Sequence, residues 1–345
     1  GAALPKTVDL GKTSGKVGVI LPDTTSSTRY VQYDAPLLTA ALKNAGITPD
    51  VQNAQGDKSR FASIAQSMIN EGVKVLIIDS IDAASGAGVE KAADQAGVKV
   101  IDYDRVNLGG TAPYYVSFDN EDVGKLQAQT MMDCLTKQGI TDPKIIMMDG
   151  GTDVDNNAVL FKQGAHDVLD PAVKAGTIKI AQEVDVSKWD NTVAATDFQQ
   201  LLTKNGGKVD GVLAANDGIA GAAIGILKAK NLQVPVTGQD ASIQGLQYIL
   251  SGDQCMTVFK DVSKEAAAAS ELAIDLVNGD TAAANALATG TLHDPTGNRD
   301  IPSVLLTPES ITLKNINDVV TAGAVTAADL CKGYTKQCAS AGVTG

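Results

Sequence analysis

The sequence of 345 residues has little of what marks a metal site, a nucleic-acid surface or a membrane span. Its two histidines, His166 and His293, lie far apart, so a histidine-rich metal site is not expected. The formal net charge of −12 argues against a nucleic-acid partner. No apolar run approaches the roughly 18 residues of a membrane-spanning helix. With 44% hydrophobic and 20% charged residues the composition is that of a globular protein, and the length suggests two domains.

Motifs for nucleotide cofactors and covalent catalysis are also missing. No Gly-x-Gly-x-x-Gly opens a helix after a strand, and no phosphate loop ends in Gly-Lys-Ser/Thr. No Gly-x-Ser-x-Gly nucleophile elbow occurs. Asp23 and Asp104 could imitate the carboxylate pair of a glycosidase, but no pair stands out as acid and base among the many polar residues that follow strands. We therefore expect no cofactor, no metal and no enzymatic activity.

Four cysteines and the N-terminus bear on the compartment. Cys331 and Cys338 lie seven residues apart in a loop-like tail and are predicted to form a local disulfide, which leaves Cys134 and Cys255 to pair. The alternative is four reduced thiols in a cytosolic protein, which the spacing does not exclude. The N-terminal Gly1 to Pro5 has neither a basic region nor an apolar core, so no signal peptide is visible.

Apolar strand patterns alternate with helical patterns along the whole chain, in two consecutive sets. The first set has predicted strands at 16–21, 47–52, 73–79, 98–102 and 116–118, with helices at 30–45, 59–71 and 88–96. The second has helices at 121–138, 157–169, 192–204, 219–230, 243–251 and 264–278, with strands at 144–148, 179–184, 209–215, 234–238 and 255–259. Such alternation predicts an α/β protein with two similar lobes, each built on a parallel sheet.

No low-complexity linker separates the two sets, so the chain is expected to pass between lobes at short hinge crossings. We place these at Asp119–Asn120, at Lys260–Asp261 and along the extended segment from Leu292 to Leu306. The predicted N-terminal lobe is 15–118 plus 261–292, the C-terminal lobe is 119–260 plus 293–330, and 331–345 is a tail.

The stretch from Val100 to Arg105 indicates where a ligand would bind. Asp104 and Arg105 follow a predicted strand, and ligands bind at the carboxyl ends of strands in an open parallel sheet. A carboxylate accepts hydrogen bonds from hydroxyls and a guanidinium donates several in a fixed fork, which suits a neutral polyol. The alternative is a surface ion pair that closes a loop.

Polar residues follow most other predicted strands in the same way, which favours one polar cleft between facing sheet ends. They are Asp23, Arg29 and Tyr30; Asp155, Asn156 and Asn157; Asp185 and Trp189; Asn216 and Asp217; Gln239 and Asp240; and Lys260. Trp189, the only tryptophan, could stack on the C–H face of a pyranose, or be an ordinary half-buried core residue. Tyr30 could form the opposite wall, or be the first apolar anchor of its helix.

Six of these stretches closely resemble the periplasmic sugar-binding proteins of ABC importers, of the ribose/galactose type and nearest to its D-xylose-binding members. They are Val100 to Arg105, Tyr115 to Asn120, Val154 to Asn157, Ala215 to Asp217, Gly238 to Asp240 and Met256 to Lys260. The resemblance extends from Lys16 to Asp318. It implies the type I periplasmic binding protein fold: two Rossmann-like lobes joined by a three-strand hinge, with a monosaccharide closed between them.

The resemblance also implies partners and site residues. The expected partners are a monosaccharide, D-xylose or D-glucose, and the membrane permease of an ABC importer, with the receptor itself a monomer. The sugar-contacting residues would be Arg29, Tyr30, Asp104, Arg105, Asn157, Trp189, Asn216, Asp240 and Lys260.

The sequence departs from the xylose-binding members in three respects. The loop from Asp23 to Thr28 is rich in Ser and Thr and one residue longer, and Tyr30 stands where a tryptophan is expected. Four cysteines are also unusual there, and would fit an extracytoplasmic lipoprotein anchored upstream of the sequence given.

Two alternative functions remain. One is a sugar-responsive repressor, which would need a helix-turn-helix although only about 15 residues precede the first strand. The other is a sugar-acting enzyme.

Overall fold

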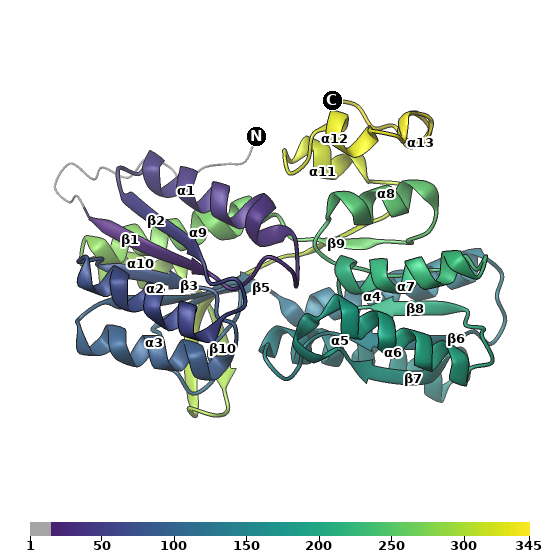
Figure 1. The fold of residues 1–345 in the computed structure, drawn as a ribbon, viewed down its shortest axis with the longest axis horizontal. Helices are drawn as coiled ribbons and strands as arrows, with labels where there is room; N and C mark the ends of the chain where they lie inside the picture. Colours follow the sequence, from purple (N-terminus) through teal and green to yellow (C-terminus); the bar gives the residue numbers. More distant parts are fainter. Residues whose placement is uncertain (1–14) are drawn as a thin grey trace.

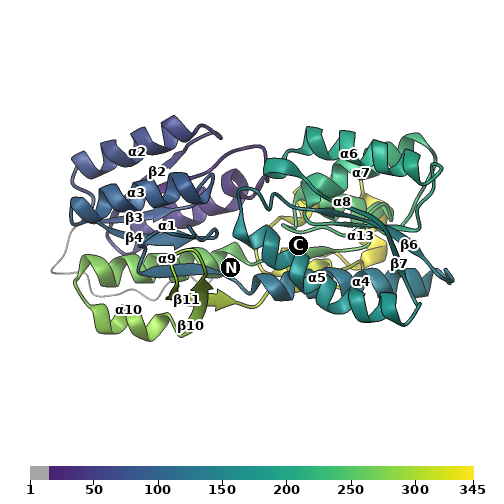
Figure 2. The ribbon, with the colours of Figure 1, turned by 90° about the horizontal axis from the view of Figure 1, so that it is seen from below.

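The computed structural model of the chain describes residues 15–345 and has two α/β lobes that lie side by side (Figure 1). In each lobe, helices cover both faces of a mostly parallel sheet, as the alternating pattern predicts (Figure 2). The segment from Gly1 to Pro5, in which no signal peptide was visible, lies outside the described residues.

The first lobe is built on a seven-stranded sheet in the order β10-β11-β5-β4-β3-β1-β2. Its strands are β1 (Lys16–Leu21), β2 (Thr48–Asn53), β3 (Val75–Ile78), β4 (Lys99–Tyr103), β5 (Tyr114–Phe118), β10 (Gly290–Asp294) and β11 (Arg299–Leu306). One face is covered by α1 (Ala35–Asn44), α9 (Val262–Val277) and α10 (Thr281–Leu287), the other by α2 (Lys58–Asn70) and α3 (Ala83–Gln95). Because both faces are covered, the inner strands are continuous apolar runs rather than alternating ones.

The third crossing lies further along the chain than predicted, which corrects the lobe boundary. Residues 293–306, assigned from sequence to the C-terminal lobe, instead form most of the β10–β11 hairpin of the first sheet. Ser303 to Leu306 pair in parallel with Tyr115 to Phe118 of β5, which fixes this segment in the first lobe. The chain crosses only at Thr307 and Pro308, between β11 and β12 (Glu309–Ile311). Asp119 and Asp261, at the other two predicted crossings, are the N-caps of the helices that follow β5 and β9 (Thr257–Phe259).

The second lobe has a parallel sheet β7-β6-β8 and a separate antiparallel pair β12-β9. The parallel strands are β6 (Lys144–Asp149), β7 (Lys179–Asp185) and β8 (Gly211–Ala214). One face carries α4 (Asn120–Lys137) and α5 (Asn156–Lys174), and the other α6 (Asn191–Lys204) and α7 (Asp217–Ala229).

The strand predicted at 234–238 is reduced to one bridge, between Val212 and Val236. Pro235 has no N–H to donate, so a regular ladder cannot form there. The segment still connects the two parts of the sheet, because Cys255 N donates to Val236 O at 2.8 Å and Val258 N donates to Gly238 O at 3.2 Å.

A small helical unit completes the chain and packs on α8 (Ile243–Ser251) (Figure 1, yellow). It consists of α11 (Asn317–Thr321), α12 (Ala327–Cys331) and α13 (Thr335–Ala341). Leu330 and Cys338 are buried against Leu246 and Ile249 of α8, so the segment predicted as a tail, 331–345, belongs to a packed unit. Both predicted disulfides are present, Cys331–Cys338 and Cys134–Cys255.

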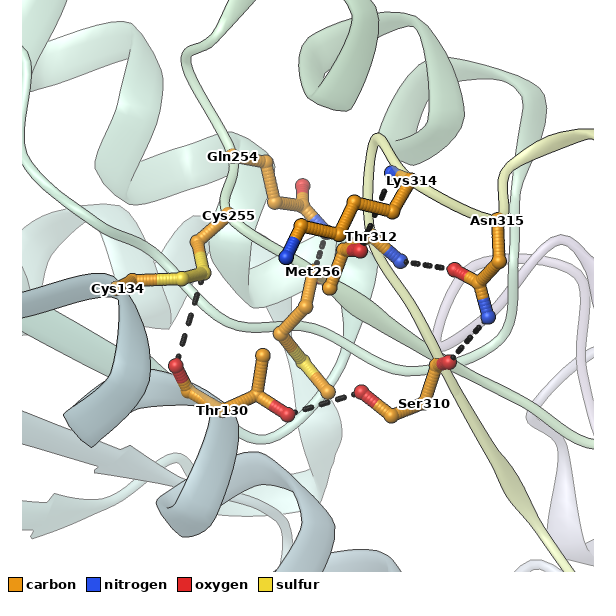
Figure 3. The surroundings of a disulfide bond; sticks show 9 residues. All are labelled: Thr130, Cys134, Gln254, Cys255, Met256, Ser310, Thr312, Lys314 and Asn315. Atoms are coloured by element: carbon orange, nitrogen blue, oxygen red, sulfur yellow. Dashed lines mark hydrogen bonds between the residues drawn. A yellow bond between two sulfur atoms is a disulfide. The ribbon is translucent and has the colours of Figure 1, made fainter. Parts of the chain in front are cut away.

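The Cys134–Cys255 disulfide joins the end of α4 to the segment that leads into β9 (Figure 3). Beside it, the hydroxyls of Thr130 on α4 and Ser310 on β12 are hydrogen-bonded at 2.9 Å (Figure 3). Both strands of the β9–β12 pair, which lead to and from the crossings, are therefore linked to α4.

Within residues 15–345, no helix combines the length and apolar character needed to cross a membrane.

Candidate functional site

The site is built first from the end of β4, where the backbone turns sharply at Asp104. Asp104 has φ of 66°, a left-handed conformation that costs a non-glycine residue energy unless its surroundings hold it. Its carbonyl oxygen accepts hydrogen bonds from Tyr115 Oη (2.7 Å), Ser117 Oγ (3.0 Å) and Asn157 Nδ2 (2.8 Å). Asn157 belongs to α5 of the second lobe, so this turn joins the two lobes as well as aiming the Asp104 carboxylate.

Arg29 holds the Asp104 carboxylate in place within a buried ion-pair network. Its Nη1 donates to Asp104 Oδ1 at 2.9 Å, and its Nε and Nη2 form a fork with Asp34 at 2.8 and 2.7 Å. Nη2 also donates to Glu265 Oε1 of α9 at 3.0 Å. The side chains of all four are at most 4% exposed, so each charge depends on the others for compensation.

This network sets the protonation of its carboxyls. Burial acts to raise the pKa of Asp104, but the positive charges of Arg29, Lys260 and Arg105 hold the pKa below its usual value. Burial raises the pKa of Glu265 to about 8, and Arg29 opposes that rise only in part. Asp104 is therefore an ionised acceptor at neutral pH.

Among the described residues, Arg105 contacts groups other than its neighbour Asp104. Its Nη1 donates to the backbone oxygen of Ser80 at 3.1 Å, and its Nε lies 3.5 Å from Asp155 and 3.8 Å from Asp79. Successive residues at the tight turn after β4 point in different directions, so each meets its own set of partners. Arg105 Nε is buried and has no hydrogen-bond partner among the described residues.

Tyr30 contributes its hydroxyl as well as its ring. The hydroxyl donates to Asp104 Oδ2 at 3.3 Å. The guanidinium carbons of Arg29 and Arg105 lie 5.3 and 5.8 Å from the ring centroid, within cation–π range. The ring therefore helps to position two cations, a role that the sequence did not indicate.

The second lobe presents residues from the N-termini of its helices. Trp189 lies directly before Asp190, the N-cap of α6, and its Nε1 donates to Asp155 Oδ2 at 3.0 Å. Gly150 and Gly151 leave room for the indole, because a Cβ on either would lie 2.2 or 2.8 Å from ring atoms. Trp189 is 4% exposed, and the edge of Phe161 packs against it with centroids 6.1 Å apart.

Two further second-lobe residues reach across to the loop after β1. Asn216 is the N-cap of α7, and its Nδ2 donates to Ser26 O at 3.1 Å. Asp240 Oδ2 accepts a hydrogen bond from Ser27 Oγ at 2.7 Å. Both contacts join one lobe to the other, so they exist only while the lobes are close together.

Lys260 comes from the second crossing and lies between the two halves of the site. Its side chain is 4% exposed, and its Nζ is 3.8 Å from Asp104 Oδ1. The same ammonium lies 5.9 Å from the ring centroid of Phe118 and 5.7 Å from that of Phe161, one ring from each lobe. A hinge residue thus contributes directly to the site.

The structure brings all nine predicted residues together around one cavity of about 30 Å³ between the lobes. Ser26, Ser27, Asp155, Phe161 and Gln239 complete the lining. The serines and Phe161 were not among the predicted site residues; Asp155 and Gln239 carried only the general signal of following a strand. Asp34 and Glu265 were missed as the supporting carboxylates, since each lies in a helix without any strand-end signal.

Among residues 15–345, no group of three or more His, Cys, Asp or Glu side chains is arranged to hold a metal ion.

Comparison with known proteins agrees with this geometry. The model of the periplasmic binding protein domain matches residues 17–281, and the chain belongs to this family. The D-xylose-binding periplasmic protein of Escherichia coli (strain K12) is 38% identical over 291 residues, 84% of each chain. The chain is accordingly a solute-binding protein and not an enzyme, as expected from its sequence.

Two solved structures are similar over nearly the whole chain. One is a carbohydrate transporter solute-binding protein from Chloroflexus aurantiacus in complex with D-glucose, with 31% identity and a TM-score of 0.82 over 92% of this chain and 98% of that one. The other is an ABC transporter solute-binding protein from Clostridium phytofermentans with bound β-D-glucose, with 29% identity and a TM-score of 0.82 over 91% and 99%. The predicted type I periplasmic binding protein fold is thereby confirmed.

Proposed function

We propose that this protein is an extracytoplasmic receptor that binds one monosaccharide, D-xylose or D-glucose, between its lobes and delivers it to the membrane permease of an ABC importer. The observation that carries the proposal is the cavity in which charged and amide side chains from both lobes surround the only tryptophan. The relatives named for D-xylose and the solved structures with D-glucose support this choice of ligand. The two disulfides favour an oxidising compartment, in agreement with the periplasmic relatives.

The electrostatics of the site suit an uncharged ligand. The cavity is lined by three cationic side chains, Arg29, Arg105 and Lys260, and by three carboxyl side chains, Asp104, Asp155 and Asp240. A sugar therefore meets strong donors and acceptors without an uncompensated charge. Hydrogen bonds to charged groups contribute roughly 1.5–3 kcal/mol each, which gives affinity to a molecule that has only hydroxyls to offer.

We assign the sugar contacts to two kinds of group. Asp104 and Asp240 would accept hydrogen bonds from sugar hydroxyls, and Arg105, Lys260, Asn157 and Asn216 would donate them. Trp189 would lie against the C–H face of the ring, where aromatic surfaces pack well on apolar patches. Arg29 and Tyr30 would act mainly by fixing Asp104 and Arg105, since their polar groups are already engaged with protein partners.

Sugar entry requires the lobes to move apart, because a cavity of about 30 Å³ has room for one or two water molecules only. The contacts of Asn216 with Ser26 and of Asp240 with Ser27 would break as the lobes rotate about the crossings at Asp119, at Lys260–Asp261 and at Thr307–Pro308. Small-angle scattering should show a smaller radius of gyration with sugar than without it. An unchanged radius despite confirmed binding would contradict a hinge motion.

Isothermal titration against a panel of aldoses tests the function directly. We expect one binding site for D-xylose or D-glucose, with the sugar recovered chemically unchanged. The panel should include both sugars, because D-xylose lacks only the exocyclic CH2OH of D-glucose and the pair shows whether the site accepts that group. No heat with any aldose would refute the proposal, and a sugar recovered isomerised or oxidised would contradict a pure binding role.

A further inference from the structure

Tyr33 joins the two lobes on the hinge side of the cleft, outside the cavity proposed for the sugar. It belongs to the first lobe, in the π-helical turn Tyr30–Asp34, and is 6% exposed. Its hydroxyl donates to the backbone oxygen of Ala241 in the second lobe at 3.0 Å. Its ring packs in an apolar cluster that otherwise comes mainly from the second lobe and the C-terminal helices, including Leu246 and Leu330.

The acceptor lies in an unusual piece of backbone. Asp240 and Ala241 have φ of 102° and 48°, two consecutive left-handed residues without a glycine. Such a conformation persists only where the surroundings impose it. Within the second lobe, Asp217 accepts from the N–H and hydroxyl of Ser242 at 2.9 and 3.0 Å, and the N–H of Asp240 donates to Val258 O at 2.9 Å.

The first lobe contacts this turn at two points on opposite sides. Ser27 Oγ donates to the carboxylate of Asp240, which lines the proposed sugar cavity. Tyr33 donates to the carbonyl of the next residue, Ala241, and lines a separate groove of about 160 Å³ formed with the second crossing and residues 322–324. The first lobe therefore holds this turn through two separate contacts, one at the proposed sugar cavity and one at the groove.

We propose that Tyr33 is a positioning residue whose hydroxyl, by holding Ala241 when the lobes close, fixes the carboxylate of Asp240 for the sugar. This rests on the proposed function, and adds a contact outside the sugar cavity that sets affinity. Because Tyr33 touches no ligand, it acts on the stability of the closed arrangement and therefore mainly on the rate at which sugar leaves.

Tyr33→Phe keeps the ring in its cluster and removes only the hydroxyl. One neutral hydrogen bond made between the lobes in the closed arrangement corresponds to about a 2- to 10-fold change in affinity. We expect sugar binding to weaken by about that factor, with most of the change in the dissociation rate. The matched control is Tyr248→Phe, whose ring lies against Lys228 within the second lobe and should leave affinity unchanged.

A double-mutant cycle with Ser27→Ala separates positioning from general destabilisation. If both hydroxyls hold the same turn, the two losses of affinity should not add, because either one already frees Asp240. Affinity of Tyr33→Phe equal to that of the parent, or strictly additive losses, would overturn the proposal.

Hydrogen exchange, measured with and without saturating D-xylose or D-glucose, provides a readout at the turn itself. With sugar bound, the amides of residues 239–242 should exchange faster in Tyr33→Phe than in the parent, because the contact with Ala241 forms when the lobes close. Equal exchange in the sugar-bound proteins would overturn the proposed contact. If the parent binds no aldose, the proposed function fails, and faster exchange of these amides in sugar-free Tyr33→Phe would still support the link between Tyr33 and this turn.

Discussion

The two lobes hold their cleft residues in place by different physical means. The first lobe fixes its half with buried ion pairs, in which Arg29 serves Asp34, Asp104 and Glu265 together. The second lobe fixes its half by helix capping, since Asn216 caps α7 and Trp189 directly precedes the cap of α6. Ion pairs of this kind hold the first half in place whatever the lobes do. The second half makes its contacts with the first only on closure.

This difference predicts whether a substitution should affect folding, sugar binding or both. Removing a charge from the first lobe leaves other charges buried and unpaired, which harms folding and binding together. Replacing a capping amide of the second lobe by another capping residue costs a neutral hydrogen bond between the lobes, which harms closure and leaves the fold intact. The predictions below run from the largest expected effect to the smallest.

Arg29→Met should have the largest effect, because it leaves three buried carboxyl groups without their cation. We expect the free energy of unfolding to fall by about 3–5 kcal/mol, and sugar binding to be lost with the position of Asp104. Urea unfolding and calorimetric titration measure the two effects. Arg60→Met, an exposed arginine on α2, is the matched control and should change neither. A loss below about 1 kcal/mol in Arg29→Met would show that the network does not support the fold.

Arg105→Ala should weaken sugar binding by about 10- to 100-fold, which corresponds to roughly 1.4–2.8 kcal/mol. The Arg105 side chain lines the cavity, and its removal also takes away the cation that lies 3.5 Å from Asp155. Because its ion pairs are 3.5 Å or longer, the fold should lose less than in Arg29→Met. Arg105→Lys should recover only part of the affinity, since an ammonium lacks the planar fork. Titration showing parent affinity for Arg105→Ala would place the sugar elsewhere.

Asn216→Ser separates capping from closure in the second lobe. Serine is also a good N-cap, so α7 should keep its stability. The amide that donates to Ser26 O is lost, so sugar binding should weaken by only about 2- to 10-fold. Calorimetric titration beside Arg105→Ala gives the comparison. If Asn216→Ser were as damaging as Arg105→Ala, the contrast drawn between the lobes would be wrong.

The smallest effect, at acidic pH, is expected for one buried carboxyl group in each lobe, Glu90 and Asp149. In the first lobe, burial raises the pKa of Glu90 to about 10, with the charge of Asp102 adding to the rise, so Glu90 is protonated at pH 7. In the second lobe, burial and the adjacent Glu183 raise the pKa of Asp149 to about 9. Glu90→Gln and Asp149→Asn keep these groups neutral in the folded and the unfolded state, and should change stability by less than about 1 kcal/mol near pH 4, where the parent carboxyls still hold their protons.

The pH dependence of stability distinguishes these variants from the parent. A raised carboxyl pKa means that the folded state keeps a proton that the unfolded state releases near pH 4.5. The stabilisation is therefore full below that pH and is lost as the pH rises toward about 10. Between the unfolded and the folded pKa, the free energy of unfolding of the parent falls by about 1.4 kcal/mol per pH unit for each such group. Each substitution should remove that contribution from the slope of unfolding free energy against pH. Urea unfolding between pH 6 and 9 measures it, and unchanged slopes would mean that both groups are ionised in the folded protein.

Much of the cleft could be predicted because parallel sheets place the residues after their strands at one edge. Asp104, Asn216 and Asp240 each follow an apolar run, and that signal is local in the sequence. The family resemblance selected nine of these residues as sugar contacts, among them Asn157 and Lys260, whose positions depend on the relative arrangement of the lobes.

The remainder depends on contacts that leave no local signal. Glu265 lies in an alanine-rich helix and becomes a partner of Arg29 only when α9 packs beside the first lobe. The direction of Arg105 is set by the turn at Asp104, whose left-handed φ cannot be deduced from the neighbouring residues. The segment 293–306 has the alternating polar pattern of an exposed linker, and only its long-range pairing with β5 makes it part of the first lobe.

Trp189 offers the most direct test of the central claim that a neutral sugar binds between the lobes. It is the only tryptophan of the chain, it is 4% exposed, and it lines the cavity. When the protein is titrated with D-xylose or D-glucose, its tryptophan fluorescence should therefore change and then saturate. The midpoint of this change should equal the dissociation constant from calorimetry, and it should shift to higher sugar concentration in Arg105→Ala. Binding heat without any change in Trp189 fluorescence would contradict the account, because the sugar would then lie outside this cleft.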